Sequence, residues 1–293
     1  MLRAAIDLGT NSVRLLVGTV EKKRVAVKYT GLQTCRLGQG LQPGGEISPQ
    51  AVERTLQALS DYHRLVQDLE VKQVNIVATS ALREAKNADG FCRQVERLFG
   101  WSIKIISGEE EAFLSYLGAT SAVKLLPGLI PVVLDIGGGS TELVFSAQGR
   151  LEAASYPVGA VRCTENTLSD EEIRSLLEPG LQKIVEAGPV QLIGAGGTVT
   201  SLAAVAQGLT VYDPEAVQGF LLPKEEIHLL REKLAAMSPA ERMQLPGLHP
   251  GRADVIVAGA AILQVIVDGL DCEKIMVSDA DLLHGILLHY PAL

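Results

Sequence analysis

Short apolar runs rich in β-branched residues alternate along the chain with longer stretches whose apolar positions recur every three or four residues. The short runs, such as 74–79 and 132–134, predict buried strands, and the longer stretches, such as 49–66 and 88–99, predict helices. Because strands and helices alternate from one end of the chain to the other, the pattern predicts an α/β fold with mixed sheets.

Three glycine-rich turns each follow a predicted strand, at 7–12, 135–144 and 194–198. Glycine lets a ligand approach the main chain closely, and successive backbone N–H groups in such a turn form an anion site. The first two turns share an Asp-(Leu/Ile)-Gly pattern with an apolar run on both sides. This weak repeat indicates two related halves, each with one phosphate-binding hairpin.

The second turn also carries oxygen atoms suited to a cation. Ser140 and Thr141 add hydroxyl donors, while Asp135 and Glu142 place a carboxylate on each side of the glycines. Donors for phosphate that are flanked by carboxylates favour a site for phosphate and a hard divalent cation. A glycine-rich hairpin without a ligand is the alternative for this segment alone.

Charged side chains at other turns leave two roles open. Glu109–Glu111 lie where a predicted strand passes into a helix, so they fit either a general base or an acidic first turn that the helix dipole stabilises. Arg83, Arg162 and Arg252 lie at turns, where an arginine binds phosphate if a phosphate loop is near and is otherwise a surface residue.

Composition narrows the classes of function. The 293 residues carry a net charge of -8 and only 4% aromatic residues, which argues against nucleic acid and anionic membranes as partners. The most apolar late stretch, 255–267, is too short to span a bilayer. Four widely spaced cysteines without a CxxC pair, and the lack of a visible signal peptide, predict reduced thiols in a cytoplasmic protein.

Several motifs follow one another in a specific order. They are 7–12, Thr79-x-Ala81-x-Arg83-x-Ala85-x-Asn87, 105–112, 135–144, Pro157-x-Gly159-Ala160-Val161-Arg162, Gly194-x-Gly196-Gly197-Thr198 and Arg252-Ala253-Asp254-x-Ile256. In this order they resemble the exopolyphosphatase / guanosine pentaphosphate phosphatase (Ppx/GppA) family, and the resemblance covers nearly the whole chain. Each turn alone is shared with actin, heat-shock ATPases and sugar kinases.

The resemblance implies the fold of actin, heat-shock ATPases and sugar kinases, in which two ribonuclease-H-like α/β domains have the active site in the cleft between them. We expect these domains at 1–124 and 125–293. This fold permits the last helix, expected at 279–290, to return to the first domain and pack on it.

The resemblance also implies roles for individual residues. Glu111 matches the catalytic base, and Asp135 and Glu142 match carboxylates associated with Mg²⁺ or another divalent cation. The third glycine turn comprises Gly196, Gly197 and Thr198. The residues that match phosphate ligands are Gly9, Thr10, Asn11, Ser12, Arg83, Gly137, Gly138, Gly139, Ser140, Thr141 and Arg252.

The implied activity is that of a phosphoric anhydride hydrolase, an exopolyphosphatase that removes the terminal phosphate of inorganic polyphosphate. A phosphohydrolase acting on guanosine pentaphosphate (pppGpp) is the close alternative. An ATP-dependent kinase or ATPase of the same fold, with adenosine at the third turn, and a non-catalytic sensor of nucleotide or polyphosphate are alternatives from other classes. No nucleic acid and no membrane is expected as a partner, and a homodimer is one assembly that the sequence allows.

Overall fold

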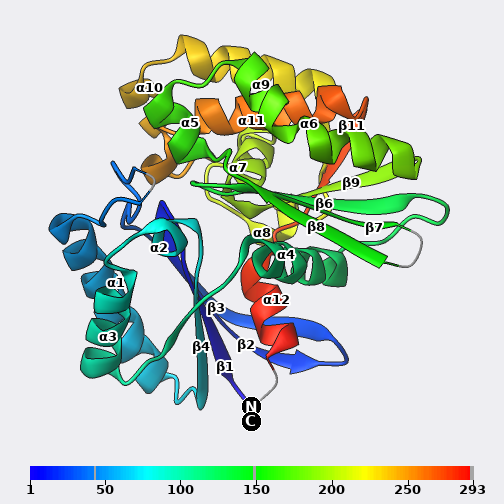
Figure 1. Cartoon of the computed structure of the whole chain (residues 1–293). Helices are drawn as coiled ribbons and strands as arrows, with labels where there is room; N and C mark the ends of the chain where they lie inside the picture. The colour runs from blue at the N-terminus through cyan, green and yellow to red at the C-terminus, as the bar shows by residue number, and fades with distance from the viewer. Residues whose placement is uncertain (43, 148–149, 291–293) are drawn as a thin grey trace. The chain divides into compact units, whose positions relative to one another are not determined.

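The computed structural model describes residues 1–42, 44–147 and 150–290. They form two compact units: unit 1 comprises Met1–Gly118 and the residues from Leu282 on, and unit 2 comprises Ala119–Asp281. The boundary between the two units falls after Gly118, inside helix α4 (Gly108–Ala122), whereas the sequence led us to expect it between 124 and 125. Each unit is built on one sheet (Figure 1).

Unit 1 contains a five-stranded mixed sheet in the order β3-β2-β1-β4-β5. Strands β1, β2 and β3 form an antiparallel meander, and β4 and β5 continue the sheet in parallel with β1. The central strand β1 is buried along nearly its whole length, as a strand with neighbours on both sides requires. The strands span Arg3–Leu8 (β1), Ser12–Glu21 (β2), Arg24–Thr34 (β3), Gln73–Ala78 (β4) and Ile103–Ile105 (β5).

Helix α1 begins where the sequence signals predict. The Ser48 side chain accepts a hydrogen bond from Ala51 N, and Pro49 takes the first helical position of α1. The apolar residues of α1 recur at helical spacing and join the core of the unit. The helices span Pro49–Asp68 (α1), Ser80–Glu84 (α2), Ala88–Phe99 (α3), Gly108–Ala122 (α4) and Leu282–His289 (α12).

The last helix, α12, packs on the first strands of unit 1. It begins at Leu282 and not at 279, and Ile286 shares a buried cluster with Ala5 of β1. A Cβ on Gly285 would lie 1.9 Å from the carbonyl oxygen of Leu114, so only glycine fits where α12 contacts α4. Helix α12 is therefore part of the unit that contains β1.

Unit 2 contains a six-stranded mixed sheet in the order β10-β11-β9-β6-β7-β8. Strands β6 and β7 form an antiparallel hairpin, and β9 pairs in parallel with the other side of β6. The strands span Ile130–Ile136 (β6), Thr141–Ala147 (β7), Arg150–Tyr156 (β8), Val190–Ala195 (β9), Leu221–Pro223 (β10) and Lys274–Val277 (β11).

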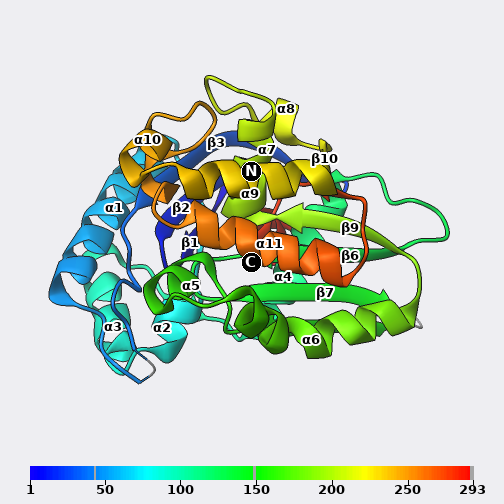
Figure 2. The ribbon, with the colours of Figure 1, turned by 90° about the horizontal axis from the view of Figure 1, so that it is seen from above.

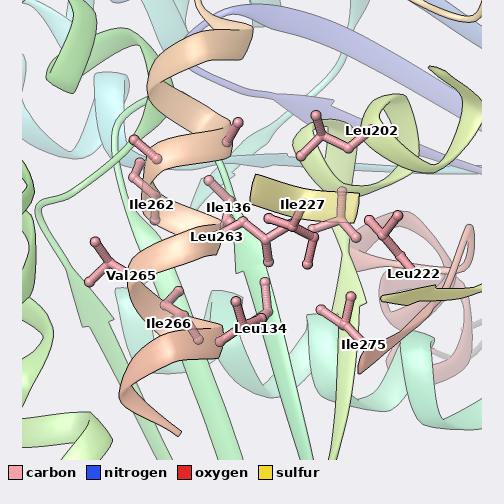
Figure 3. Close-up of a cluster of buried hydrophobic side chains, with 14 of the residues drawn as sticks. Leu134, Ile136, Leu202, Leu222, Ile227, Ile262, Leu263, Val265, Ile266 and Ile275 are labelled. Carbon is pink, nitrogen blue, oxygen red and sulfur yellow. The ribbon is translucent and has the colours of Figure 1, made fainter. Parts of the chain in front are cut away.

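The core of unit 2 is built around the apolar helix α11, which lies between α6 and α9 (Figure 2). Leu263 and Ile266 of α11 share a buried cluster with Leu134 and Ile136 of β6 (Figure 3). The helices span Ala160–Asn166 (α5), Asp170–Ala187 (α6), Gly196–Ala206 (α7), Pro214–Val217 (α8), Lys224–Ala236 (α9), Pro239–Met243 (α10), Pro250–Arg252 (η1) and Ile256–Gly269 (α11). Across the described ranges, no helix is both long and apolar enough to cross a membrane.

Candidate active site

The hairpin of β6 and β7 places the two predicted metal-associated carboxylates on one face. Asp135 and Glu142 are directly opposite each other in the register of the two strands, and opposite residues project to the same side. Both side chains are buried, with exposed fractions of 8% and 1%. Ser155, which faces Glu142 from β8, donates a hydrogen bond of 2.7 Å to Glu142 Oε1 and holds that carboxylate in place.

The third glycine turn lies against Asp135. Gly196 has a φ of +79°, and a Cβ at this position would lie 2.0 Å from Asp135 Oδ1. Glycine is therefore required both for the left-handed backbone and for the close approach of the carboxylate. Thr198 donates a hydrogen bond of 3.2 Å to the carbonyl of Ile136. The structure thus brings the second and third glycine turns together at the ends of β6 and β9.

The second turn, Gly137–Ser140, is closed by a hydrogen bond of 2.9 Å from Gly137 N to Ser140 O. The carbonyls of Gly137 and Gly138 accept hydrogen bonds of 2.9 and 2.8 Å from the first N–H groups of α5, and the Gly139 carbonyl accepts one of 2.9 Å from Arg162 Nε. In a planar trans peptide the C=O and the N–H of the next residue point in opposite directions. The N–H groups of 138–140 therefore point away from α5 and form the row of donors that an anion site needs.

Gly159 and Arg162, which belong to the motif Pro157-x-Gly159-Ala160-Val161-Arg162, shape this turn. A Cβ on Gly159 would lie 2.4 Å from Gly138 O, so only glycine lets α5 approach the turn. Arg162 fixes the Gly139 carbonyl from the same helix. Thr141 is fully buried and its hydroxyl donates to Val158 O, which leaves Ser140 as the hydroxyl candidate for a phosphate.

The first turn in unit 1 has the same closure. Gly9 N donates a hydrogen bond of 3.1 Å to Ser12 O, and the carbonyls of Thr10 and Asn11 accept hydrogen bonds from backbone N–H groups of the segment 35–38. Asp7, the counterpart of Asp135, is buried and faces Arg14 across the hairpin. The Arg14 guanidinium donates to Asp7 Oδ2 from Nε (3.0 Å) and from Nη2 (2.7 Å).

The structure distinguishes among the three glutamates at the start of α4. Glu109 is exposed, whereas Glu110 accepts hydrogen bonds from Lys104 and from the Tyr290 hydroxyl. Partial burial opposes ionisation of Glu110, but the hydrogen bonds from these two donors and the positive charge of Lys104 hold its pKa below the ordinary value. Glu110 therefore belongs to a surface cluster with Lys104 and Tyr290, the residue that follows α12.

Glu111 is the one of the three that is buried, with 8% exposed. Arg83 Nη1 donates to Glu111 Oε2 at 3.0 Å and to the carbonyl of Ile106 at 2.9 Å. This contact fixes the position of the carboxylate. The sequence placed Arg83 and Glu111 in separate roles, and the structure brings the two side chains together.

Arg252 is held by the first turn of α7. Its Nη1 donates to Gly197 O and to Ser201 Oγ, both at 2.7 Å. A Cβ on Gly197 would lie 2.3 Å from Arg252 Nη2, so the guanidinium lies directly on the backbone of the third turn. Ser201 had no predicted role, because its contact with Arg252 is set by the fold and has no local pattern.

The oxygen ligands at the second turn fit a hard cation. Mg²⁺ is bound in proteins through one or two carboxylates and keeps several waters. Asp135 and Glu142 supply two buried carboxylates on one face beside the phosphate turn. In the described part of the chain, no group of three or more His, Cys, Asp and Glu side chains gathers in a way that could hold a metal. The chemistry of the two carboxylates thus fits the predicted divalent-cation site.

Comparison with known proteins places these features in a family. The model of the Ppx/GppA phosphatase family matches residues 21–290. Exopolyphosphatase 2 of Mycobacterium tuberculosis is 34% identical, over 97% of this chain and 97% of that protein. The crystal structure of the Ppx/GppA family member of Aquifex aeolicus is 32% identical with a TM-score of 0.80, and covers 98% of this chain and 96% of that one. An exopolyphosphatase from Cytophaga hutchinsonii is 25% identical with a TM-score of 0.89, covering 98% and 96%.

Proposed function

Because the chain belongs to the Ppx/GppA phosphatase family, we propose that it is an exopolyphosphatase that hydrolyses the terminal phosphoanhydride bond of inorganic polyphosphate and releases orthophosphate. Within the site, the proposal rests on Glu111, whose carboxylate is buried and held in place by Arg83. A hydrolase needs such a base to activate water, and the other two glutamates of the same helical turn do not meet this requirement.

In the proposed reaction Glu111 accepts a proton from a water molecule whose oxygen attacks the terminal phosphorus in line with the leaving oxygen. The new P–O bond forms as the bond to the bridging oxygen breaks, and the shortened chain leaves with the negative charge. The N–H groups of 138–140 and the first turn, Gly9–Ser12, bind non-bridging phosphate oxygens. Arg252 and Arg83 complement the charge of the phosphates.

Asp135 and Glu142 are the residues that would hold Mg²⁺, which when bound neutralises charge on the phosphates. Their burial on one face, and the hydrogen bond from Ser155 to Glu142, keep both carboxylates in a fixed orientation. Asp135 also lies close to Gly196 of the third glycine turn.

The position of Arg252 supports hydrolysis over the kinase alternative. A nucleoside at the third turn would need the open backbone surface of Gly196 and Gly197. The Arg252 guanidinium already lies on Gly197.

A cytoplasmic location and a homodimer remain predictions.

The Glu111→Gln variant tests the proposal. The amide keeps the shape of the side chain and a hydrogen-bond acceptor for Arg83 but cannot accept a proton. We expect kcat for orthophosphate release from polyphosphate to fall by about 1,000-fold, while the affinity for polyphosphate stays within about threefold of the wild type. Undiminished release by the variant would remove Glu111 from the mechanism. The Glu109→Gln variant is the matched control, and its kcat should not change because Glu109 is exposed.

A further inference from the structure

The hairpin of β2 and β3 in unit 1 concentrates positive charge on an acidic protein. The segment 21–28 holds four cations, Lys22, Lys23, Arg24 and Lys28, and one carboxylate, Glu21, while the whole chain has a net charge of -8. All four cationic residues are exposed. In the described part of the chain, the ion pairs are formed by cationic side chains outside this hairpin. None of the four hairpin cations takes part in one of these pairs. Their charge is therefore available to a ligand.

The turn of this hairpin uses residues that its backbone disfavours. Glu21 pairs with Arg24, so Lys22 and Lys23 form a two-residue connection, and their φ angles are +48° and +62°. Positive φ at both central residues is the pattern of a type I′ turn, for which Asn-Gly is strongly preferred. Two lysines in the left-handed region lower the stability of the hairpin. Strain of this kind is concentrated at functional sites.

A bulge adds the fourth cation to the same edge. The register of β2 and β3 passes from Gly18 opposite Val27 to Val17 opposite Tyr29, so Lys28 is the additional residue of the bulge. Strand β3 is the edge of its sheet. Lysines on an edge strand also protect against pairing with another chain. That protection explains Lys28, but it does not explain why lysines occupy the strained turn.

The distance along β2 separates this hairpin from the phosphate turn. The strand begins at Ser12, the last residue of the Gly9–Ser12 turn, and ends at Glu21. Ten residues of extended strand span about 30 Å. A short phosphate chain bound at the turn ends well before the hairpin, whereas a long chain reaches it. Once the end of a long chain is bound, contact with the hairpin is an intramolecular event with a high effective concentration.

We propose that Lys22, Lys23, Arg24 and Lys28 form a second binding site for polyphosphate. This site holds the distal part of a long chain while the end of that chain is hydrolysed. The hairpin is formed by the blue strands β2 and β3 in Figure 1. This inference rests on the proposed function. It assigns a preference for long chains to a feature outside the catalytic residues. The attraction is between exposed charges, so it weakens as the salt concentration rises.

The double variant Lys22→Asn/Lys23→Gly separates this role from a structural one, because it installs the residues that a type I′ turn prefers. We expect its melting temperature to rise. Its KM for long-chain polyphosphate should increase about fivefold, as the loss of two exposed ionic contacts predicts, while its KM for tripolyphosphate stays at the wild-type value. Added salt should reduce the difference for long chains. An unchanged KM for long chains, or an equal rise for both substrates, overturns the proposal.

The control variant is Lys72→Ala/Lys233→Ala, which removes two exposed lysines outside the hairpin and should change neither KM. Binding of long-chain polyphosphate to the Glu111→Gln variant, with and without the hairpin substitutions, tests the second site without turnover. One outcome separates the two proposals. If neither the wild type nor any variant releases phosphate from any chain length, but the hairpin substitutions still weaken binding of polyphosphate, the proposed function fails and the second site stands. Equal competition by single-stranded DNA of the same charge would overturn the assignment to polyphosphate.

Discussion

The two hairpin turns, Gly9–Ser12 in unit 1 and Gly137–Ser140 in unit 2, share their backbone and differ in their charge. Each is closed by a hydrogen bond from its first N–H to its last carbonyl. Each follows a strand that carries a buried aspartate. The residue opposite the aspartate is Arg14 in the first hairpin and Glu142 in the second.

This single difference decides what each turn can bind besides phosphate. The Arg14 guanidinium neutralises Asp7, so the first hairpin needs no cation. Asp135 and Glu142 place two buried carboxylates on one face, a donor set that suits a hard divalent cation. For this repeated backbone we therefore predict phosphate binding at both turns and Mg²⁺ binding at the second one.

The largest expected effect comes from making the second hairpin more like the first. In Glu142→Gln the side chain can still accept the hydrogen bond from Ser155, but one carboxylate is lost. We expect kcat/KM for polyphosphate to fall by about 1,000-fold at a fixed Mg²⁺ concentration, because the cation loses a charged ligand. The Mg²⁺ concentration needed for half-maximal activity should rise. Ser155→Ala keeps the carboxylate, and we expect its kcat/KM to fall by only about tenfold. Equal losses in the two variants would contradict a role for Glu142 in cation binding.

Breaking the ion pair of the first hairpin should mainly affect stability. Arg14→Ala leaves the Asp7 carboxylate buried without its guanidinium, and the side chains of the pair are only 18% and 6% exposed. We expect the free energy of unfolding, measured with urea, to fall by about 3 kcal/mol. Arg64→Ala removes an exposed ion pair with Asp61 and should change it by less than about 1 kcal/mol. A similar change in both variants would show that burial does not set the strength of the Asp7–Arg14 pair.

A smaller effect should distinguish the two segments that pack against these turns, one at Gly159 and the other at Gly38. A Cβ on Gly159 would meet the backbone of Gly138 at 2.4 Å, whereas a Cβ on Gly38 would meet the Thr10 side chain at 2.4 Å. A side chain adjusts more easily than a backbone that carries the phosphate donors. Gly159→Ala should therefore lower kcat/KM about tenfold and Gly38→Ala about threefold. The reverse order, measured from orthophosphate release, would place the more critical phosphate contacts at the first turn.

Much of the fold could be predicted from the chain itself. The apolar runs marked most strands, and a serine N-cap is a local signal for the start of α1 (Ser48) and of α6 (Ser169). The two Asp-(Leu/Ile)-Gly turns could be found because each motif lies within a few consecutive residues. The pairing of Asp7 with Arg14 and of Asp135 with Glu142 was also within reach, since each pair is symmetric about its four-residue turn.

Contacts between distant segments could not be predicted in this way. Nothing near Gly159 indicates that it packs on Gly138, and nothing near Ser201 indicates that it holds Arg252. Burial of Glu111 and exposure of Glu109 follow from how α4 packs, although both residues lie in the same acidic run. The resemblance to a family implied a catalytic base at Glu111, and the structure shows that this is the buried glutamate of the acidic run.

The most direct test of the central claim is orthophosphate release from polyphosphate, pppGpp and ATP, measured side by side with Mg²⁺ at equal concentrations of terminal phosphate. We expect polyphosphate to have the highest kcat/KM and ATP the lowest. Release from ATP alone would contradict the assignment to the polyphosphate hydrolases. A kcat/KM for pppGpp far above that for polyphosphate would show that the same site acts on the guanosine nucleotide instead.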